Sequence, residues 1–499
     1  MCTISANNLL FTEIVHIMKL ILFLYEGLEG LLMDFHKVID DYRNEIIQTI
    51  QDFVKIKSVE ECSEEGKPFG EGPYNALVYA LNIGRKLGFK VENFDGYAGH
   101  AEYGEGNEIV GILVHVDVVP EGDGWTYPPF GGEIHDGKIY GRGSYDDKGA
   151  CIAALYALKA VKNSGLTLGK KVRIIFGANE ESGMADIPHY LNKNREPDVV
   201  FSPDSPFPVV YGEKGILDLI FSKEINKKHG KFSIESIEGG DIPKKIPDFC
   251  NVIINLSKQD KPNLMSIVAR YIEKKGAKVE LIEKRDKICI KYMGKSAWAI
   301  SPDNSDSDNA ISGMMEFLEY LCLPDGDLKD FVQFYNERIG YTIYGEGMGC
   351  AFQDDISTPL TFCPTIINYD GETVKMHVHI RYPIKTKFEE LMAKIKNTLS
   401  AYSIEIEIER HSKPHYISEY SFLVRTLMNI YREETGDYNI KAITMAGGTY
   451  ARTLKNAVAF GPLFPNEKQV AHEVDEYLCI DSIIRATKIY ARAIYKLAR

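Results

Sequence analysis

The segment spanning residues 109–149, IVGILVHVDVVPEGDGWTYPPFGGEIHDGKIYGRGSYDDKG, is the feature that most constrains how this chain can fold. It begins with an apolar run, typical of a buried strand, that carries His115 and Asp117. Side chains two apart on a strand point to the same face, so we expect this imidazole and carboxylate to lie side by side. The segment ends with two adjacent carboxylates, Asp146 and Asp147, where helical periodicity begins. This pattern suits a metal ligand and the group that orients it.

Apolar and amphipathic patterns alternate on both sides of this segment. They predict helices at 33–56, 75–87, 147–163 and 187–194, and strands at 90–94, 101–104, 108–119, 171–178 and 198–204. Such alternation indicates an α/β sheet with helices on both faces, which binds ligands at the carboxyl ends of its strands. His115 with Asp117, Glu180 with Glu181, and Asp204 all lie at predicted strand ends.

The pattern changes after Gly215. Short strand-like runs, separated in places by helical patterns at 263–275, 308–322 and 387–401, predict an inserted α+β domain over residues 215–412. Two strand–helix–strand passages within it suggest a duplication, without a clean internal repeat. From residue 413 the helix-and-strand pattern of the first part returns, with helices at 418–434 and 480–498 and the Gly-rich AGGTYAR at 446–452. We therefore expect one domain from residues 33–214 plus 413–499.

Residues 1–32 stand apart from this organisation. The stretch from Leu9 to Met33 is apolar, but five charged or His residues interrupt it, so it lacks the roughly 20 apolar residues that span a bilayer. It also lacks the basic start and small-residue cleavage site of a signal peptide. We interpret it either as an appendage or, preferably, as an extension ahead of a true start at Met33.

Composition excludes several classes of function. The formal net charge of −13 over 499 residues, without a basic stripe, argues against a nucleic-acid-binding protein. The nine cysteines are scattered and contain no C-x-x-C, which is typical of reduced thiols in the cytoplasm. We expect a cytoplasmic protein with neither a nucleic-acid nor a membrane partner.

Histidines and carboxylates in five separate segments offer metal-ligand chemistry. The candidates are His115 with Asp117, Asp146 with Asp147, Glu180 with Glu181, Asp204 and His472. Each alone is more often a solvated surface feature. Together, at strand ends of an α/β frame, they are expected to converge at one edge of the sheet. Imidazole and carboxylate ligands suit zinc, and carboxylate-rich sites also suit manganese.

The motifs HVDVVPEGDGW, YGRGSYDDKG, NEESG, FSPD, GGTYAR and AHEVDEY together resemble those of the dinuclear zinc aminopeptidase-like hydrolases, the peptidase family 20 type. Within that family the PepV-type and Xaa-His dipeptidases are the most similar. The resemblance runs from about Met33 to the C-terminus. It implies a zinc aminopeptidase-like catalytic domain, an inserted domain that acts as a lid, and a monomer.

The resemblance also implies roles for individual residues. His115 and Asp204 would bind one zinc or manganese ion, Glu181 and His472 the other, and Asp146 would bridge them ahead of a cis peptide to Asp147. Asp117 would orient His115, and Glu180 would be the general base. In the inserted domain Arg381, in HIRYP, would bind the substrate carboxylate, and Gly447 and Gly448 would approach the substrate through their main chain.

Two positions of the inserted domain depart from the family pattern. In GKSAWAISP, residues 294–302, Trp298 stands where the family has a histidine that hydrogen-bonds the developing oxyanion. In GGDIPKKIPD, residues 239–248, Lys244 stands where the family has an asparagine. Indole donates one hydrogen bond but carries no charge, and losing an oxyanion donor typically costs about 10²–10³ in rate.

The resemblance predicts metal-dependent hydrolysis of dipeptides. Two alternatives stay open. The chain is a metal- and peptide-binding homologue impaired by Trp298 and Lys244, or it is a deacylase of N-acyl amino acids, since pocket shape and not the metal set separates the two substrate classes.

Overall fold

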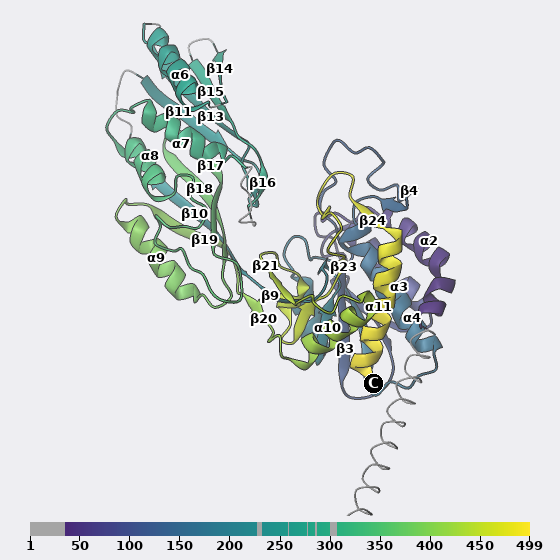
Figure 1. Cartoon of the computed structure of the whole chain (residues 1–499). Coiled ribbons are helices and arrows are strands. Elements are labelled where there is room, and N and C mark those ends of the chain that lie inside the picture. Colours follow the sequence, from purple (N-terminus) through teal and green to yellow (C-terminus); the bar gives the residue numbers. More distant parts are fainter. Residues whose placement is uncertain (1–34, 227–231, 258, 277, 285–286, 300–306) are drawn as a thin grey trace, which may run out of the picture. The chain divides into compact units, whose positions relative to one another are not determined.

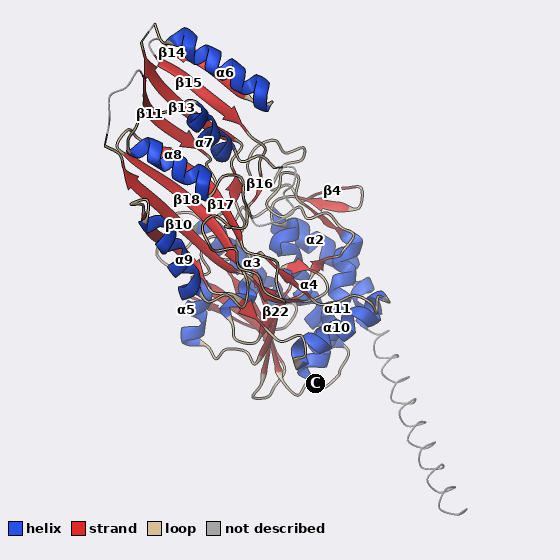
Figure 2. Cartoon of the chain, turned by 60° about the vertical axis from the view of Figure 1, so that its left-hand side comes forward, coloured by secondary structure: helices blue, strands red, loops and turns tan. Residues whose placement is uncertain are grey.

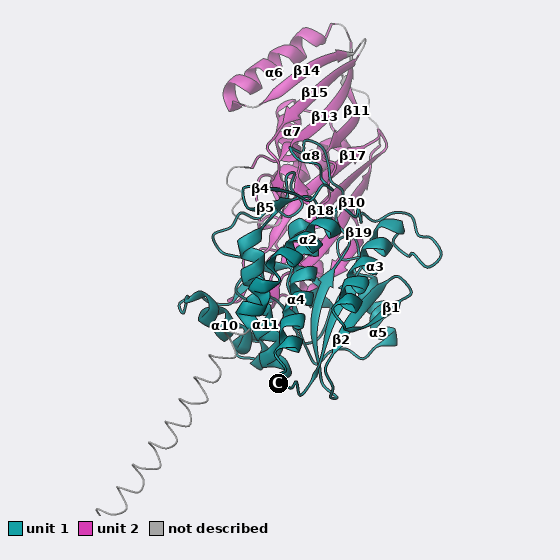
Figure 3. Ribbon diagram, turned by 90° about the vertical axis from the view of Figure 1, so that its right-hand side faces the viewer, with its two compact units in different colours: residues 1–211, 417–443, 449–499 teal, residues 212–416, 444–448 magenta. Residues whose placement is uncertain are grey.

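The computed structural model describes residues 35–226, 232–257, 259–276, 278–284, 287–299 and 307–499 (Figure 1). The chain forms two compact units, drawn in different colours in Figure 3. Unit 1 comprises residues 1–211, 417–443 and 449–499, and unit 2 comprises residues 212–416 and 444–448. The proposed extension at 1–32 lies outside the described residues, so its interpretation stays a prediction.

The first sheet has nine strands in the order β1-β2-β6-β3-β7-β22-β9-β20, with β21 paired to β9. Its strands are β1 (Lys90–Phe94), β2 (Ala98–Tyr103), β3 (Ile109–His115), β6 (Lys171–Gly177), β7 (Val199–Ser202), β9 (Val210–Glu213), β20 (His415–Tyr416), β21 (Ile443–Met445) and β22 (Ala457–Ala459). The strands β6, β3, β7 and β22 run parallel. At one side β2 pairs antiparallel with β6 and β1 with β2, and at the other β9 pairs antiparallel with β22 and β20 with β9. The sheet is therefore mixed, with a parallel centre.

Helices cover both faces of this sheet. They are α2 (Arg43–Val54), α3 (Glu71–Lys86), α4 (Gly149–Asn163), α5 (Asp186–Lys193), α10 (Phe422–Thr435) and α11 (Ile480–Ala498). On β3, Ile112 and Val114 join the core formed with α4 and α11, while Leu113 joins the core on the α5 side. Burial on both faces explains why the strand reads as a continuous apolar run and not as an alternating one. The predicted α/β fold class is confirmed.

Unit 2 is built on a second, antiparallel sheet in the order β14-β15-β13-β11-β17-β18-β10-β19 (Figure 2). Its strands are β10 (Gly215–Glu224), β11 (Phe232–Gly239), β13 (Phe249–Leu256), β14 (Val279–Lys284), β15 (Lys287–Met293), β17 (Thr361–Tyr369), β18 (Thr373–Tyr382) and β19 (Glu405–Ser412). Its helices are α6 (Lys261–Lys275), α7 (Ala310–Tyr320), α8 (Asp327–Arg338) and α9 (Phe388–Ser400), which share one apolar core with the sheet. The α+β class expected for the insertion is confirmed. Counting only strands of this sheet, a strand–strand–helix–strand passage occurs twice, in β11–β13–α6–β14 and β17–β18–α9–β19.

One expectation about the site strand is wrong. The strand predicted to run to residue 119 ends at His115, and Asp117 lies in the loop that follows. The bond from Val116 N to Gly177 O is the last one to β6, and Val118 N then donates to Ser58 O, outside the sheet. Asp117 therefore reaches the site from a loop, and the two-residue strand repeat does not place it. No helix within the described ranges is long and apolar enough to cross a membrane.

The packing of α3 provides a stability test. The side chain of Leu77 is fully buried in the core of unit 1, whereas Lys86, in the last turn of the same helix, is exposed. Leu77→Ala is expected to lower the free energy of unfolding by about 2–5 kcal/mol, because it removes buried methyl groups and leaves a cavity. Lys86→Ala, the control, should change it by less than about 0.5 kcal/mol. Denaturant unfolding of both variants measures the difference, and equal effects would contradict the described core.

Candidate metal centre

Three parallel strands deliver the candidate residues to one edge of the sheet. β3 ends at His115, β6 leads into the loop that carries Glu180 and Glu181, and β7 leads to Asp204. β3 pairs in parallel with both β6 and β7. Loops that follow neighbouring parallel strands meet at the carboxyl edge, where α/β folds bind their ligands. The convergence expected from the sequence is what this strand order produces.

Asp146 lies between the two candidate histidines. His115 Nε2 lies 2.9 Å from Asp146 Oδ1, and His472 Nε2 lies 3.2 Å from Asp146 Oδ2. Glu181 is 3.0 Å from His472 Nε2, and Asp204 is 3.9 Å from His115 Nε2. The structure thus brings all five predicted ligands together, with each oxygen of one carboxylate facing a different imidazole. A carboxylate that bridges two metal ions needs this arrangement.

The loop residue Asp117 supports both sides of this cluster. Its backbone carbonyl lies 3.0 Å from His115 Nδ1, and its carboxylate lies 3.5 Å from the same nitrogen. A carbonyl oxygen only accepts, so Nδ1 carries a proton, and Nε2, 2.9 Å from Asp146 Oδ1, is the ring nitrogen that could bind a metal ion. The Asp117 carboxylate also accepts from the backbone N–H groups of Glu180 and Glu181, both at 3.1 Å. Asp117 therefore positions a histidine and a neighbouring loop at once.

Two residues that the sequence analysis did not single out hold the backbone at Asp146. Glu476 is fully buried and forms an ion pair of 2.6 Å with Arg142, itself 2% exposed. Its second oxygen accepts from the backbone N–H groups of Tyr145 and Asp146 at 3.0 and 3.1 Å. The sequence signals were the places of Arg142 within YGRGSYDDKG and of Glu476 within AHEVDEY, four residues after His472. The Asp146–Asp147 peptide is cis, as the resemblance implied.

Asp186 plays a comparable part in the loop after β6. This fully buried carboxylate accepts from Ala178 N at 2.7 Å, from Asn179 N at 3.0 Å and from the hydroxyl of Tyr450. The ring of Tyr450 meets that of His115 edge-on, with centroids 6.1 Å apart. Burial raises the pKa of Asp186 to about 7. No sequence pattern pointed to Asp186, because its partners are backbone groups and the side chain of Tyr450, which is distant in the sequence.

The electrostatics of the cluster fit a cationic ligand. Burial, together with the Glu181, Asp117 and Asp146 carboxylates, raises the pKa of Glu180 to about 8. Burial first, and then Asp146, raises the pKa of Asp204 well above its usual value. Carboxylates crowded in a buried site are costly to ionise, and adjacent divalent cations reverse that cost.

The donor set also fits metal ions. Within the described part of the chain, two groups have ligand atoms mutually within 4.8 Å: His115, Glu180 and Asp204, and His115, Asp146 and Glu181. One oxygen of Glu180 is buried without a hydrogen-bond partner among the described residues. Glu180 belongs to one of these groups, so distance alone does not separate a ligand from a general base.

The predicted substrate residues lie together within unit 2. Arg381, 5% exposed on β18, donates from Nη1 to the carbonyl of Ala446 at 3.0 Å. Ala446 immediately precedes Gly447 and Gly448. The guanidinium and the Gly-rich loop are thus neighbours, as a joint role would require.

The two departures from the family pattern are also neighbours. The short strands β12 (Lys245–Ile246) and β16 (Ala297–Trp298) pair, with Lys245 opposite Trp298. Lys244 lies next to β12, and its carbonyl accepts from Ala299 N at 3.0 Å. The ammonium of Lys245 lies 4.9 Å from the centroid of the Trp298 ring. The two unusual residues therefore occupy one small structural element.

Comparison with known proteins agrees with this geometry. Residues 111–496 match the model of Peptidase family M20/M25/M40. A Bacillus subtilis (strain 168) protein described as "Putative dipeptidase YtjP" is 38% identical over 92% of this chain and 98% of its own. A Staphylococcus epidermidis protein described as "Putative dipeptidase" is 33% identical over the same shares.

Solved structures share the fold. Human carnosine dipeptidase 1 has a TM-score of 0.55 at 15% identity, covering 94% of this chain and 99% of the other. Aminoacylhistidine dipeptidase from Vibrio alginolyticus has a TM-score of 0.52 at 14% identity, covering 91% and 96%. With the family model spanning most of its length, the chain belongs to peptidase family M20/M25/M40.

Proposed function

We propose that the protein is a metal-dependent dipeptidase of the cytoplasm that acts as a monomer. The observation that carries the proposal is the placement of His115 and His472 on opposite oxygens of Asp146, at 2.9 and 3.2 Å. The relatives described as dipeptidases support the substrate class.

The contacts support the ligand roles that the family resemblance implies. His115 and Asp204 would hold one ion, Glu181 and His472 the other, and Asp146 would contribute one oxygen to each. Zinc suits this mixture of imidazole and carboxylate, and manganese is the next candidate. Two such ions would supply Lewis-acid activation of the scissile carbonyl and of a water molecule.

Glu180 is proposed as the general base. It takes a proton from the attacking water and returns it to the nitrogen of the leaving amine, so it ends the cycle in its starting state. Its backbone N–H is held by Asp117 at 3.1 Å, which fixes the start of its side chain. A general base acts efficiently when its position relative to the attacking water is well defined.

Arg381, Gly447 and Gly448 are proposed to bind the substrate. A guanidinium recognises a carboxylate through two parallel N–H donors, and the C-terminus of a dipeptide is a carboxylate. A glycine has no side chain to keep a ligand away from the backbone. An N-acyl amino acid offers the same carboxylate, so the assay below includes one.

Asp117→Asn tests the supporting shell. The amide has one carbonyl oxygen where the carboxylate has two, so it cannot accept from both backbone N–H groups. We expect metal affinity to fall about 10–100-fold, the usual cost of losing such a supporting group. Titration calorimetry with Zn²⁺ or Mn²⁺ measures it. Asp123→Asn changes an exposed carboxylate and is the control; an unchanged affinity in Asp117→Asn would contradict the role.

Glu180→Gln tests the proposed base. We expect the metal-loaded wild type to hydrolyse dipeptides faster than N-acyl amino acids, and chelation to abolish activity. The variant should lose at least about 10²-fold in kcat, the scale of general acid–base catalysis, while it still binds metal. Glu65→Gln, at an exposed position, is the control.

The same assay on the wild type tests the substrate class. If the wild type prefers the N-acyl amino acid to the dipeptide, the protein is a deacylase and not a dipeptidase.

The double variant Trp298→His with Lys244→Asn tests the altered element of unit 2. Restoring an imidazole donor should raise kcat for a dipeptide by up to about 10²–10³-fold, because one oxyanion donor is worth that much. Steady-state kinetics of the wild type and the double variant measure the gain. Activity found only in the double variant would show that the natural chain is an impaired binding homologue.

A further inference from the structure

Along most of β10 and β18, the sheet of unit 2 is buried on both faces, and the two faces differ in character. On β18, Val378 and Ile380 belong to the apolar core shared with the helices. The alternate residues His377, His379 and Arg381 point to the other face, because successive side chains on a strand alternate. All three are at most 5% exposed. Buried polar side chains need partners, so this face must be organised by hydrogen bonds.

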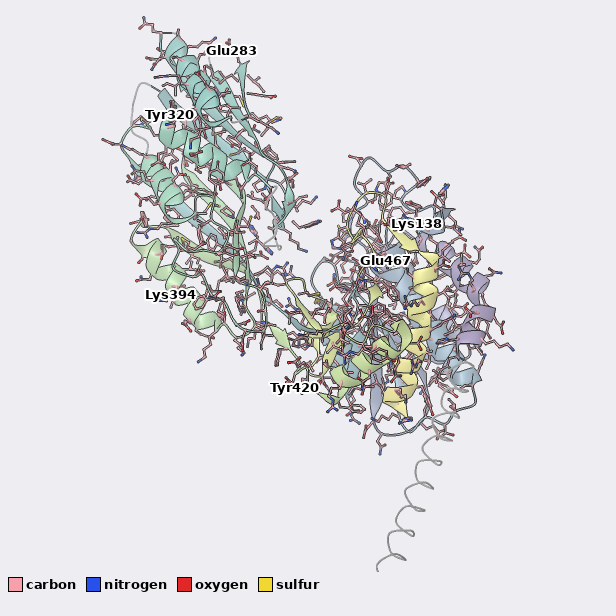
Figure 4. All side chains as sticks on the ribbon, viewed as in Figure 1. Lys138, Glu283, Tyr320, Lys394, Tyr420 and Glu467 are labelled. Atoms are coloured by element: carbon pink, nitrogen blue, oxygen red, sulfur yellow. The ribbon has the colours of Figure 1, made fainter. Side chains whose placement is uncertain are left out.

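The helices of unit 2 pack on the apolar face of its sheet. Figure 4 labels Tyr320 on α7 and Lys394 on α9, two of the helices that pack on the sheet. On β10, the alternating residues Leu217 and Leu219 join the same core, so Asp218 between them points to the polar face.

Three residues of the polar face form a chain of hydrogen bonds. Asp218 on β10 lies directly opposite His379 on β18 in the strand register. Asp218 Oδ1 and His379 Nδ1 are 2.5 Å apart, and Arg381 Nε donates to His379 Nε2 at 2.8 Å. Asp218 and Arg381 are each 5% exposed, and His379 is fully buried.

The chemistry of the donors sets the direction of this chain. A guanidinium only donates, so Nε2 of His379 accepts and carries no proton. The proton of the neutral ring is then on Nδ1, which donates to Asp218. Burial lowers the pKa of His379 to about 4, which keeps the ring neutral next to Arg381.

Arg381 is thereby held at two different nitrogens. His379 accepts from Nε, and the carbonyl of Ala446 accepts from Nη1 at 3.0 Å. Two contacts on separate nitrogens fix the plane of the guanidinium. Recognition of a carboxylate by a pair of parallel N–H donors depends on that plane, and a side chain already fixed loses less rotamer freedom on binding.

We propose that Asp218 and His379 are positioning residues that hold the guanidinium of Arg381 in the orientation required to bind the carboxylate of the substrate. This inference rests on the proposed function, in which Arg381 binds that carboxylate. Neither residue touches the substrate: they act through Arg381 alone.

The test pairs two variants of His379 with two substrates. His379→Leu removes both hydrogen bonds, whereas His379→Gln offers an acceptor for Arg381 and a donor for Asp218. The substrates are a dipeptide and the same dipeptide with a C-terminal amide, which lacks the carboxylate. We expect His379→Leu to raise KM for the dipeptide about 10-fold or more, with a smaller change in kcat, because the guanidinium loses a buried partner. KM for the amide should stay unchanged, and His379→Gln should restore most of the affinity for the dipeptide.

His377→Leu is the matched control. His377 lies on the same strand and the same face and is 5% exposed. Its Nδ1 lies 2.6 Å from Thr365 Oγ1, and its Nε2 lies 2.9 Å from Glu409 and 3.9 Å from Asp218, beyond hydrogen-bond distance of the latter. An equal rise in KM for this variant, or an equal effect of His379→Leu on the amide, would show a general structural role and overturn the proposal.

Arg381→Ala distinguishes a failure of the proposed function from a failure of the proposed positioning role. If wild type hydrolyses neither substrate, the proposed function fails. If Arg381→Ala loses the preference for the dipeptide over the amide while His379→Leu keeps wild-type KM values, the function stands and the positioning role fails. Should His379→Leu not fold, judged by thermal unfolding, Asp218→Asn tests the same chain: the weaker acceptor should give a smaller, carboxylate-dependent rise in KM, and no rise overturns the proposal.

Discussion

A buried cluster of carboxylates at the edge of a parallel sheet is the constraint on which the organisation of unit 1 depends. Asp146, Glu180, Glu181 and Asp204 lie close together in a region where water provides little screening. Burial makes these carboxylates costly to ionise, repulsion between them adds to that cost, and both effects raise the pKa values of Glu180 and Asp204. Two imidazoles face the cluster, and the donor set fits divalent cations. The site is thus electrostatically costly for the protein alone, which is common where binding or catalysis is performed.

In unit 1 a second set of carboxylates holds this cluster in place. Each of them accepts hydrogen bonds from two consecutive backbone N–H groups. Asp117 accepts from the consecutive backbone N–H groups of Glu180 and Glu181. Glu476 does the same for residues 145 and 146, and Asp186 for residues 178 and 179. Each one ties down a loop by its main chain, immediately next to a candidate ligand or base. Because these bonds are made to backbone groups, they fix the shape of a loop whatever side chains it carries.

Unit 2 uses its sheet differently. One face packs helices through aliphatic side chains, and the other buries a line of polar groups that ends at Arg381. The pairing of β10 with β18 is enough to align these polar groups. Residues two apart on β18 share a face, and Asp218 lies opposite His379 in the strand register. The small paired element that carries Lys244 and Trp298 belongs to the same unit. The two substituted positions of the family pattern, Lys244 and Trp298, thus both lie in unit 2.

The sequence by itself determined the α/β class, the α+β insertion and the positions of most elements, because periodic burial is a local property of the chain. Among the elements of the two large sheets and their helices, helix α8 and strands β9, β11, β19, β20, β21 and β22 were not anticipated, and the site strand is shorter than predicted. The motifs also named the residues that converge on Asp146, since they follow strands whose parallel order brings their ends together. Only the tertiary structure revealed Glu476, Asp186 and the Asp218–His379 pair. Their partners are backbone groups or side chains distant in the sequence, and a contact of that kind leaves no periodic or local pattern to read.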